Sequence, residues 1–375
     1  MKVFVDFVST TKIQGNVAKY TGGTNYAKYM ANALYDYIED KKQINILLPK
    51  GCEISDEDTF FNPFQIEQVD SLVNVGYNQG DILYLPQVNG SLLTQLPKIK
   101  KRFPYLKIYG TLHDRQHNIV KFDSYDTIFE DGIKRQVLVL WIYYFIKRLI
   151  FNIIYNHCVK ALDKVFTVSN YSMQLLSTSA VKSIKYYVQG TYLKNKVQGS
   201  RGDYVLFVGG NRGEKNLLRA LLAFRKYKST NNDSLKFIAT GISSNLEKKL
   251  SRIVELNDDV VLKQYVSDEE LSILYSNCRF VVFISKAEGY GCPIREAMQY
   301  GKVVLASRTT SVPEVAGAAI YYVDPLSVDS IVKGYIYLAD DEHLDKYEEF
   351  VARRNNIVNE VAKQDLSIFM NDFFE

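Results

Sequence analysis

The chain has 375 residues, of which 47% are hydrophobic and 23% charged, a globular composition long enough for two domains. Its net charge of +4 is small, and no dense stripe of Lys and Arg accompanies it. These values argue against a disordered chain and against a nucleic-acid-binding protein, so we expect no nucleic acid among its partners.

The cysteines and the N-terminus favour a cytoplasmic protein. Four cysteines lie far apart and form no C-x-x-C pair, so neither a zinc knuckle nor a disulfide framework is predicted. The first apolar run, 2–8, contains Asp6, which is typical of a core strand and not of a signal peptide.

Apolar runs alternate with helical patterns in the first half of the chain. Helices are predicted at 22–38 and 170–177. Strands are predicted at 2–8, 44–49, 81–87, 106–114 and 165–169. This alternation is typical of a parallel α/β sheet, and we expect the first domain to cover 1–190.

A further helix is predicted at about 134–155. Its longest apolar run, 136–145, has about half the ~20 residues that span a bilayer, and Lys147 and Arg148 come soon after it. We therefore expect no transmembrane helix. Because the basic residues ring the helix, we favour a helix packed within the first domain, while Trp and Tyr beside Lys and Arg leave peripheral membrane contact open.

The pattern restarts after a polar segment, 191–203, which is predicted to be a linker. The second domain is expected at 204–349, and a C-terminal helix at about 350–375 is expected to pack back on the first domain. The predicted strands of the second domain are 204–209, 235–240, 260–266, 279–284, 302–306 and 319–324. The fold class is α/β, with two Rossmann-like α/β/α domains facing a central cleft.

The stretch 279–313 combines a strand, a glycine loop and a helix. Ligands of open α/β sheets bind outside the carboxyl ends of strands, which places the segment from Ser285 to Cys292 at a ligand. Gly289 and Gly291 let backbone amides approach a phosphate closely. We expect Glu288 to point into the cleft and Glu296, in the first turn of the helix, to accept hydrogen bonds from ribose hydroxyls. The alternative is a solvated loop charge and a glutamate that favours the helix dipole.

A second glycine loop, VGGNRGEK at 208–215, follows a strand and opens a helix. It lacks the G-x-G-x-x-G spacing, so a nicotinamide-dependent oxidoreductase loses support. It places Arg212 and Lys215 beside a helix N-terminus, an arrangement that can bind a diphosphate and stabilise its departure. A solvated pair of basic side chains is the alternative.

Two weaker signals lie in the first half. Gly22 and Gly23 precede a helix and offer a second phosphate contact, and His113 lies at the end of a strand, where side chains often face a cleft. A structural histidine bonded to backbone is equally compatible with the pattern. No metal-ligand motif is present, so we expect no metal and no cofactor.

The two glutamates and their surroundings resemble a known family. E288-GYGCPIR-E296 resembles the E-x7-E motif of the retaining GT-B glycosyltransferases of family 4. The similarity covers about Tyr204 to Pro325 and thins to GGTNYAKYMANAL, TLHD and VFTVSNYS in the first half. Three departures are that Gly210 stands where an arginine is common, Tyr290 where a phenylalanine is common, and Cys292 where a leucine is common.

The resemblance implies a role for each matching residue. Glu288 would contact the donor sugar, Lys215 the diphosphate and Glu296 the ribose, while His113 would lie near the sugar. The expected catalytic residues are Glu288, His113 and Lys215. The expected donor-binding residues are Arg212, Glu296, Gly289, Tyr290, Gly291, Cys292, Gly23, Tyr265 and Val266.

The implied reaction transfers a hexose or deoxyhexose from a nucleotide-diphosphate sugar to a glycan or lipid-linked acceptor, with retention of configuration and without a metal. Cell-surface polysaccharide synthesis in the cytoplasm, or peripherally at the inner face of the membrane, is the expected setting. The alternative is a non-catalytic GT-B adaptor or partner subunit, against which the presence of Glu288, Glu296 and Lys215 together argues. Neither the sugar nor the oligomeric state follows from the sequence.

Overall fold

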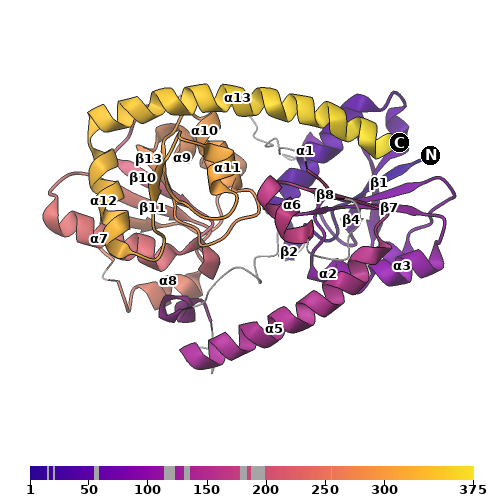
Figure 1. Cartoon of the computed structure of the whole chain (residues 1–375), viewed down its shortest axis with the longest axis horizontal. Helices are drawn as coiled ribbons and strands as arrows, with labels where there is room; N and C mark the ends of the chain where they lie inside the picture. Colours follow the sequence, from indigo (N-terminus) through magenta and orange to yellow (C-terminus); the bar gives the residue numbers. More distant parts are fainter. Residues whose placement is uncertain are drawn as a thin grey trace. The chain divides into compact units, whose positions relative to one another are not determined.

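The computed structural model describes residues 1–14, 17–19, 22–54, 59–113, 123–130, 136–177, 184–186, 199–254 and 256–375. The chain divides into two compact units (Figure 1). The first comprises 1–115, 148–192 and 360–375, and the second comprises 116–147 and 193–359. Residues 116–147, which we had placed in the first domain, therefore group with the second unit.

The first unit contains a seven-stranded parallel sheet in the order β5-β4-β1-β6-β7-β8-β9. Its strands are β1 (Val3–Asp6), β4 (Ile44–Pro49), β5 (Gln65–Val69), β6 (Ile82–Leu85), β7 (Lys107–Leu112), β8 (Lys164–Thr167) and β9 (Ile184–Tyr186). Its helices are α1 (Gly22–Tyr37), α2 (Gly90–Leu93), α3 (Leu96–Arg102) and α6 (Asn170–Ser177). A short antiparallel pair, β2 (Lys12–Gln14) and β3 (Val17–Lys19), precedes α1. The five predicted strands are all present.

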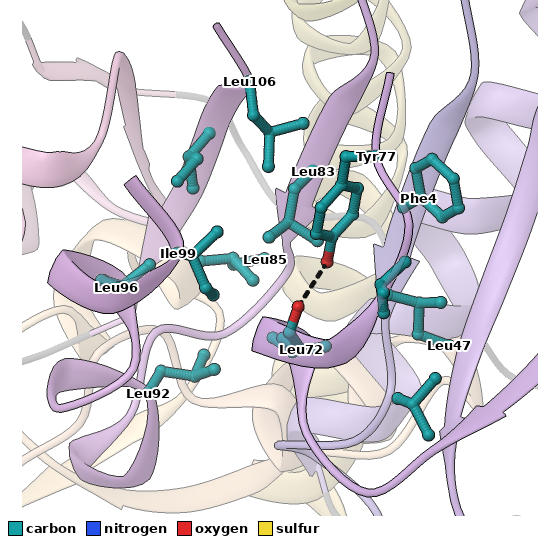
Figure 2. Close-up of a cluster of buried hydrophobic side chains, with 13 residues drawn as sticks. Phe4, Leu47, Leu72, Tyr77, Leu83, Leu85, Leu92, Leu96, Ile99 and Leu106 are labelled. Atoms are coloured by element: carbon teal, nitrogen blue, oxygen red, sulfur yellow. Dashed lines mark hydrogen bonds between the residues drawn. The ribbon is translucent and has the colours of Figure 1, made fainter. Parts of the chain in front are cut away.

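An apolar cluster fixes one face of this sheet (Figure 2). Phe4, Leu83 and Leu85 from the strands meet Leu96 and Ile99 of α3, and all five side chains are almost completely buried. The same cluster contains Tyr77, whose hydroxyl donates a hydrogen bond to the carbonyl of Leu72 at 3.1 Å. The polar group that enters this core is therefore paired, as the cost of burying an unpaired hydroxyl requires.

The second unit has a six-stranded parallel sheet in the order β12-β11-β10-β13-β14-β15. Its strands are β10 (Tyr204–Val208), β11 (Lys236–Thr240), β12 (Val260–Leu262), β13 (Phe280–Phe283), β14 (Val304–Ser307) and β15 (Tyr321–Val323). Its helices are α7 (Leu217–Thr230), α8 (Ser244–Leu250), α9 (Asp268–Asn277), α10 (Cys292–Gln299), α11 (Val312–Ala316) and α12 (Val328–Ala339). All six predicted strands of this half are present. The strand order reverses between β10 and β13, the point where ligands bind in such sheets.

The last helix, α13 (Asp341–Phe374), contributes to both units (Figure 1). In the first unit, Phe373 lies edge-on to Tyr84 and Tyr109, with ring centroids 5.3 and 5.1 Å apart. In the second unit, Arg295 donates to Asn355 at 2.5 Å. Aromatic packing thus secures the C-terminal turns, and buried polar contacts secure the turns before them.

The helix predicted at 134–155 is α5 (Val137–Cys158), and it differs from our expectation in its surroundings. By length and composition Val137–Ala161 passes as a membrane-crossing helix, the single such segment within the described ranges, but a core helix of a soluble protein passes the same test. Only 6% of its most apolar window is buried, so the favoured interpretation of a packed helix is wrong for most of its length.

Candidate active site

The loops that follow β10 and β13 bring Lys215 and Glu288 together. The Lys215 ammonium lies 2.6 Å from a Glu288 carboxylate oxygen, and the two side chains are 8% and 7% exposed. The ammonium also lies 4.9 Å from the centre of the Phe283 ring. Because a buried charge is costly without a partner, Glu288 supplies the counter-charge that Lys215 needs at the carboxyl edge of the sheet.

The loop after β10 is fixed by a left-handed residue and by backbone contacts. Asn216 has a φ of 67°, and its side-chain amide donates to the carbonyls of Ile284 and Pro325. The amide of Lys286 donates to the carbonyl of Glu214 at 2.7 Å. The two loops are therefore held against each other by the Asn216 side chain and by main-chain groups, and the position of Lys215 beside Glu288 does not depend on their own attraction alone.

Hydroxyl groups from the loop after β14 hold the Glu288 loop in place. The Glu288 amide donates to Thr310 Oγ1 at 2.9 Å, and the Ser311 hydroxyl lies 3.1 Å from the carbonyls of both Glu288 and Tyr290. The Thr309 hydroxyl donates to the carbonyl of Ser285 at 3.1 Å. We did not assign these hydroxyls a role from sequence, although a run of Ser and Thr after a buried strand is a signal for it.

Gly291 opens α10 in a conformation that favours glycine. Its φ is +99°, and a Cβ there would meet Ile294 at 3.4 Å. Pro293 follows within the first turn, as expected, and Gly301, with a φ of +70°, ends the helix. Glu296 is the fifth residue of α10, so it lies in the second turn and not in the first turn that we predicted.

Glu296 is buried against Tyr275 of α9. The tyrosine hydroxyl donates a hydrogen bond of 2.7 Å to Glu296 Oε2, and the Tyr275 ring stacks on Tyr300 with centroids 5.5 Å apart. Burial raises the pKa of Glu296 above its usual value, and the Tyr275 hydroxyl opposes that rise. Tyr275 holds the Glu296 carboxylate in place, and sequence reasoning missed this contact.

The other residues of the predicted donor loop lie between the two glutamates. Gly289 and Tyr290 are buried, with 5% of Tyr290 exposed, and Cys292 is partly buried at the start of α10. They are thus carried by the same short segment as Glu288, which places their backbone beside the Lys215–Glu288 pair.

Arg212 is in the same loop as Lys215 but turns toward a different carboxylate. Its Nε lies 2.9 Å from Glu214, and 55% of the Arg212 side chain is exposed. A phosphate that binds Arg212 would therefore have to displace the Glu214 carboxylate or share the guanidinium with it.

Tyr265 and Val266 follow β12, two strands from β10 in the sheet. Tyr265 is 53% exposed and Val266 is half-buried. Just before them, the carbonyls of Gln264 and Lys263 accept hydrogen bonds from the amides of Gly241 and Ile242. The segment is therefore fixed at the carboxyl edge of the same sheet, where a nucleotide base can stack on an exposed aromatic ring.

A segment at 123–130, earlier in the chain, packs beside these loops within the second unit. Asp126 forms an ion pair with Lys286 in which each side chain is 4% exposed, and Asp123 accepts a 2.7 Å hydrogen bond from Arg219. Lys249 donates to the carbonyl of Glu130 at 2.9 Å. Burial raises the pKa of Asp126 despite Lys286. Nothing in the sequence pattern led us to this segment.

Gly23 and His113 belong to the first unit. A Cβ on Gly23 would lie 1.7 Å from the side-chain oxygen of Gln87, so a side chain there requires Gln87 to move. His113 Nε2 lies 2.9 Å from the carbonyl of Pro86, which makes Nε2 the protonated nitrogen, and desolvation lowers the His113 pKa to about 4. The ring packs edge-on to Tyr26. His113 is therefore a neutral imidazole whose Nδ1 can accept a hydrogen bond.

No group of three or more His, Cys, Asp or Glu side chains that would hold a metal ion occurs among the described residues. Asp114, which follows His113, lies outside them.

The loops at the carboxyl edge of the second sheet and the two buried glutamates lie in a region that matches a protein-family model. Residues 191–356 match the model of the family described as glycosyl transferases group 1. The C-terminal half of the chain is therefore similar to that family. Lys215, Glu288, Glu296 and Tyr275 all lie within the matched residues.

Two curated relatives of the chain are named mannosyltransferases. The chain is 34% identical over 131 residues to O-antigen chain mannosyltransferase B of Escherichia coli, which is 34% of each chain. It is 30% identical over 223 residues to O-antigen chain mannosyltransferase RfbU of Salmonella typhimurium, covering 56% of this chain and 60% of the relative. The matches therefore span about a third and about three fifths of these relatives.

Solved structures share the fold over nearly the whole chain. Sucrose-phosphate synthase from Thermosynechococcus elongatus superposes with a TM-score of 0.68 at 15% identity, covering 99% of both chains. Anabaena HepE, solved in complex with UDP and glucose, gives a TM-score of 0.67 at 14% identity, covering 100% of this chain and 98% of that one. The GT-B fold class predicted from the sequence is confirmed.

Proposed function

We propose that the protein is a retaining hexosyltransferase that moves a sugar from a nucleotide-diphosphate sugar to a glycan or lipid-linked acceptor in cell-surface polysaccharide synthesis. The observation that carries this proposal is the buried Lys215–Glu288 pair at the point where the strand order reverses. A cation and a carboxylate held there match the two ends that a sugar diphosphate presents, a charged diphosphate and a ring of hydroxyls.

The chemistry follows from the placement of these charges. Lys215 and the loop amides stabilise the diphosphate as the bond between its oxygen and the sugar carbon breaks, and Arg212 adds charge when it leaves Glu214. The acceptor oxygen bonds to the same carbon on the same face, and its proton passes to the departing diphosphate oxygen. Glu288 orients the sugar hydroxyls, and Glu296 accepts hydrogen bonds from the ribose. The donor contacts of Gly23, His113, Tyr265 and Val266 stay predictions.

Mannose is the sugar that the comparisons favour. Two relatives at 30% identity or more are named mannosyltransferases of the O-antigen chain. A mannosyl donor of the nucleotide-diphosphate class is therefore the first candidate, with glucose next because HepE was solved with UDP and glucose. We place the reaction in the cytoplasm, at the inner face of the membrane.

We further propose that transfer needs no metal ion. Support comes from Lys215, whose buried ammonium supplies the positive charge that a divalent cation would otherwise bring to the diphosphate. Activity should persist in EDTA, and loss of activity that Mg²⁺ or Mn²⁺ restores would contradict this part of the proposal.

The experiment begins with thermal shifts of the purified chain in GDP, UDP and dTDP, followed by transfer assays with the matching sugar nucleotides. One nucleoside diphosphate should raise the melting temperature, and Glu288→Ala should abolish transfer while retaining that shift. A chain that binds a nucleotide yet transfers no sugar to any acceptor or to water, and whose Glu288→Ala variant behaves identically, would instead be the non-catalytic adaptor.

A further inference from the structure

One helix of the chain presents an apolar face to solvent. Along α5, side chains three and four positions apart lie within an arc of roughly 120°, taking 100° per residue. Six of them define the α5 apolar face and are between 44% and 72% exposed: Leu138, Trp141, Ile142, Phe145, Leu149 and Ile153. This face is about 22 Å long at 1.5 Å per residue. It is a contiguous apolar patch, whereas exposed apolar residues on an ordinary surface are scattered singly.

The opposite side of α5 holds the helix to the protein. Leu140 and Tyr155 are completely or almost completely buried, and the Tyr144 hydroxyl donates a 2.6 Å hydrogen bond to Glu130. Trp141 and Phe145 stack on each other with ring centroids 5.5 Å apart, on the exposed side. The helix is therefore attached by one face, and its apolar face is the outer one.

The charges around α5 indicate what covers that face. Residues 132–162 contain Lys134, Arg135, Lys147, Arg148 and Lys160 and no Asp or Glu. An anionic lipid surface complements such a segment, whereas a second copy of the same helix would place like charges together. Tryptophan and tyrosine beside basic residues are also typical of the boundary between acyl chains and headgroups.

The position of the central charges indicates how α5 meets the lipid. Lys147 and Arg148 are the eleventh and twelfth residues of a 22-residue helix. In a spanning helix both charges would lie at the bilayer centre, where they are expensive. In a helix parallel to the surface, Arg148 lies at the edge of the apolar face and reaches the headgroup phosphates.

We propose that α5 binds flat in the interface of an anionic lipid membrane, with the α5 apolar face among the acyl chains and Arg148 at the phosphates. This inference rests on α5 and not on the donor site, so nucleotide binding and membrane binding can fail separately. It gives a reason for an exposed apolar helix in a protein that we propose to act on a glycan or lipid-linked acceptor.

Tryptophan fluorescence can detect membrane contact of α5, because Trp141 is the single tryptophan of the chain and lies on the α5 apolar face. Vesicles of phosphatidylcholine with about a third phosphatidylglycerol should float the protein and shift the Trp141 emission to shorter wavelength, and brominated acyl chains should quench it. Pure phosphatidylcholine should bind at least about tenfold more weakly, and added salt should release the protein from anionic vesicles.

Substitutions separate the apolar and charged contributions. Phe145→Glu and Leu149→Glu should each weaken vesicle binding at least about tenfold, and Arg148→Glu should weaken binding to anionic vesicles and change little on neutral ones. Ile357→Glu is the matched control, because Ile357 is 54% exposed on α13 and should bind like the wild type. All variants should keep the nucleotide thermal shift.

Three results would overturn the proposal. The first is absence of both flotation and a Trp141 shift with anionic vesicles. The second is a lipid-free dimer that Phe145→Glu converts to a monomer, which would assign the face to a second copy. The third is membrane binding that resists alkaline carbonate, which would assign α5 to a spanning helix.

Discussion

The Lys215–Glu288 pair makes a prediction that distinguishes a donor site from a structural ion pair. Glu288→Gln leaves the Lys215 ammonium buried and without its carboxylate at 2.6 Å. Removal of one partner from a buried pair costs about 3–5 kcal/mol, which lowers the melting temperature of a domain of this size by roughly 10 °C. A diphosphate restores the counter-charge. The nucleotide should therefore stabilise Glu288→Gln more than it stabilises the wild type, with an affinity at least equal to that of the wild type.

Two variants in the same unit control this measurement. Asp126→Asn breaks a second buried ion pair, with Lys286, so it should be destabilised to a similar extent. The nucleotide should, however, stabilise Asp126→Asn no more than it stabilises the wild type. Lys215→Met leaves Glu288 unpaired and removes the phosphate contact, so it should be destabilised and should lose nucleotide binding. Differential scanning fluorimetry across a nucleotide titration measures all three. Equal nucleotide stabilisation of Glu288→Gln and Asp126→Asn would refute the assignment of Lys215 to the diphosphate.

Three further predictions follow from the packing. Tyr275→Phe removes a hydrogen bond to a buried carboxylate, worth about 1.5–3 kcal/mol, and should weaken nucleotide binding roughly tenfold or more in calorimetry, whereas Tyr300→Phe should not. Phe373→Ala removes a ring buried against Tyr84 and Tyr109 and should lower the free energy of unfolding by about 3–5 kcal/mol in urea, with nucleotide binding retained. His113, with its pKa lowered to about 4, binds a proton only when unfolded between pH 6.5 and 4, so it costs up to about 3 kcal/mol of stability as the pH falls. Asp6, with its pKa raised to about 6 by burial, binds a proton in the folded protein first, so it adds stability as the pH falls below 6. In urea unfolding at decreasing pH, His113→Asn should therefore become more stable relative to the wild type, and Asp6→Asn less stable.

The sheets were predictable because buried parallel strands are continuous apolar runs. The runs VLF in β10 and FVVF in β13 are buried, and their assignment to a parallel sheet needed no tertiary information. β5 was missed because it is an edge strand of which only Val69 is buried, so its QIEQ residues carry no apolar pattern. The environment of α5 was misjudged because periodicity describes a helix face and not what covers it.

Part of the candidate site was also predictable from local sequence, and part depends on tertiary packing. Local backbone chemistry explains why glycines occupy the positive-φ positions 291 and 301 and why Pro293 suits the first turn of α10. All three residues were singled out from the sequence. The contact between Lys215 and Glu288 joins residues 73 positions apart, and that between Tyr275 and Glu296 crosses from α9 to α10. Such contacts depend on how helices pack on the sheet, which no local pattern contains.

The two glutamates are held by partners of different kinds, and that difference bears on their roles. Glu288 faces an ammonium, so a ligand phosphate bound at Lys215 would compete with Glu288 and reorganise the pair. Glu296 faces a neutral hydroxyl, which occupies Oε2 and leaves Oε1 for a ligand. Burial alone would favour protonation of Glu296, and a protonated carboxyl accepts hydrogen bonds poorly. Tyr275 opposes that protonation, because its hydroxyl donates to the ionised form. If the proposed function holds, Tyr275 would favour the ionised Glu296 that accepts hydrogen bonds from vicinal hydroxyls, while Glu288 would respond to the charge of the donor.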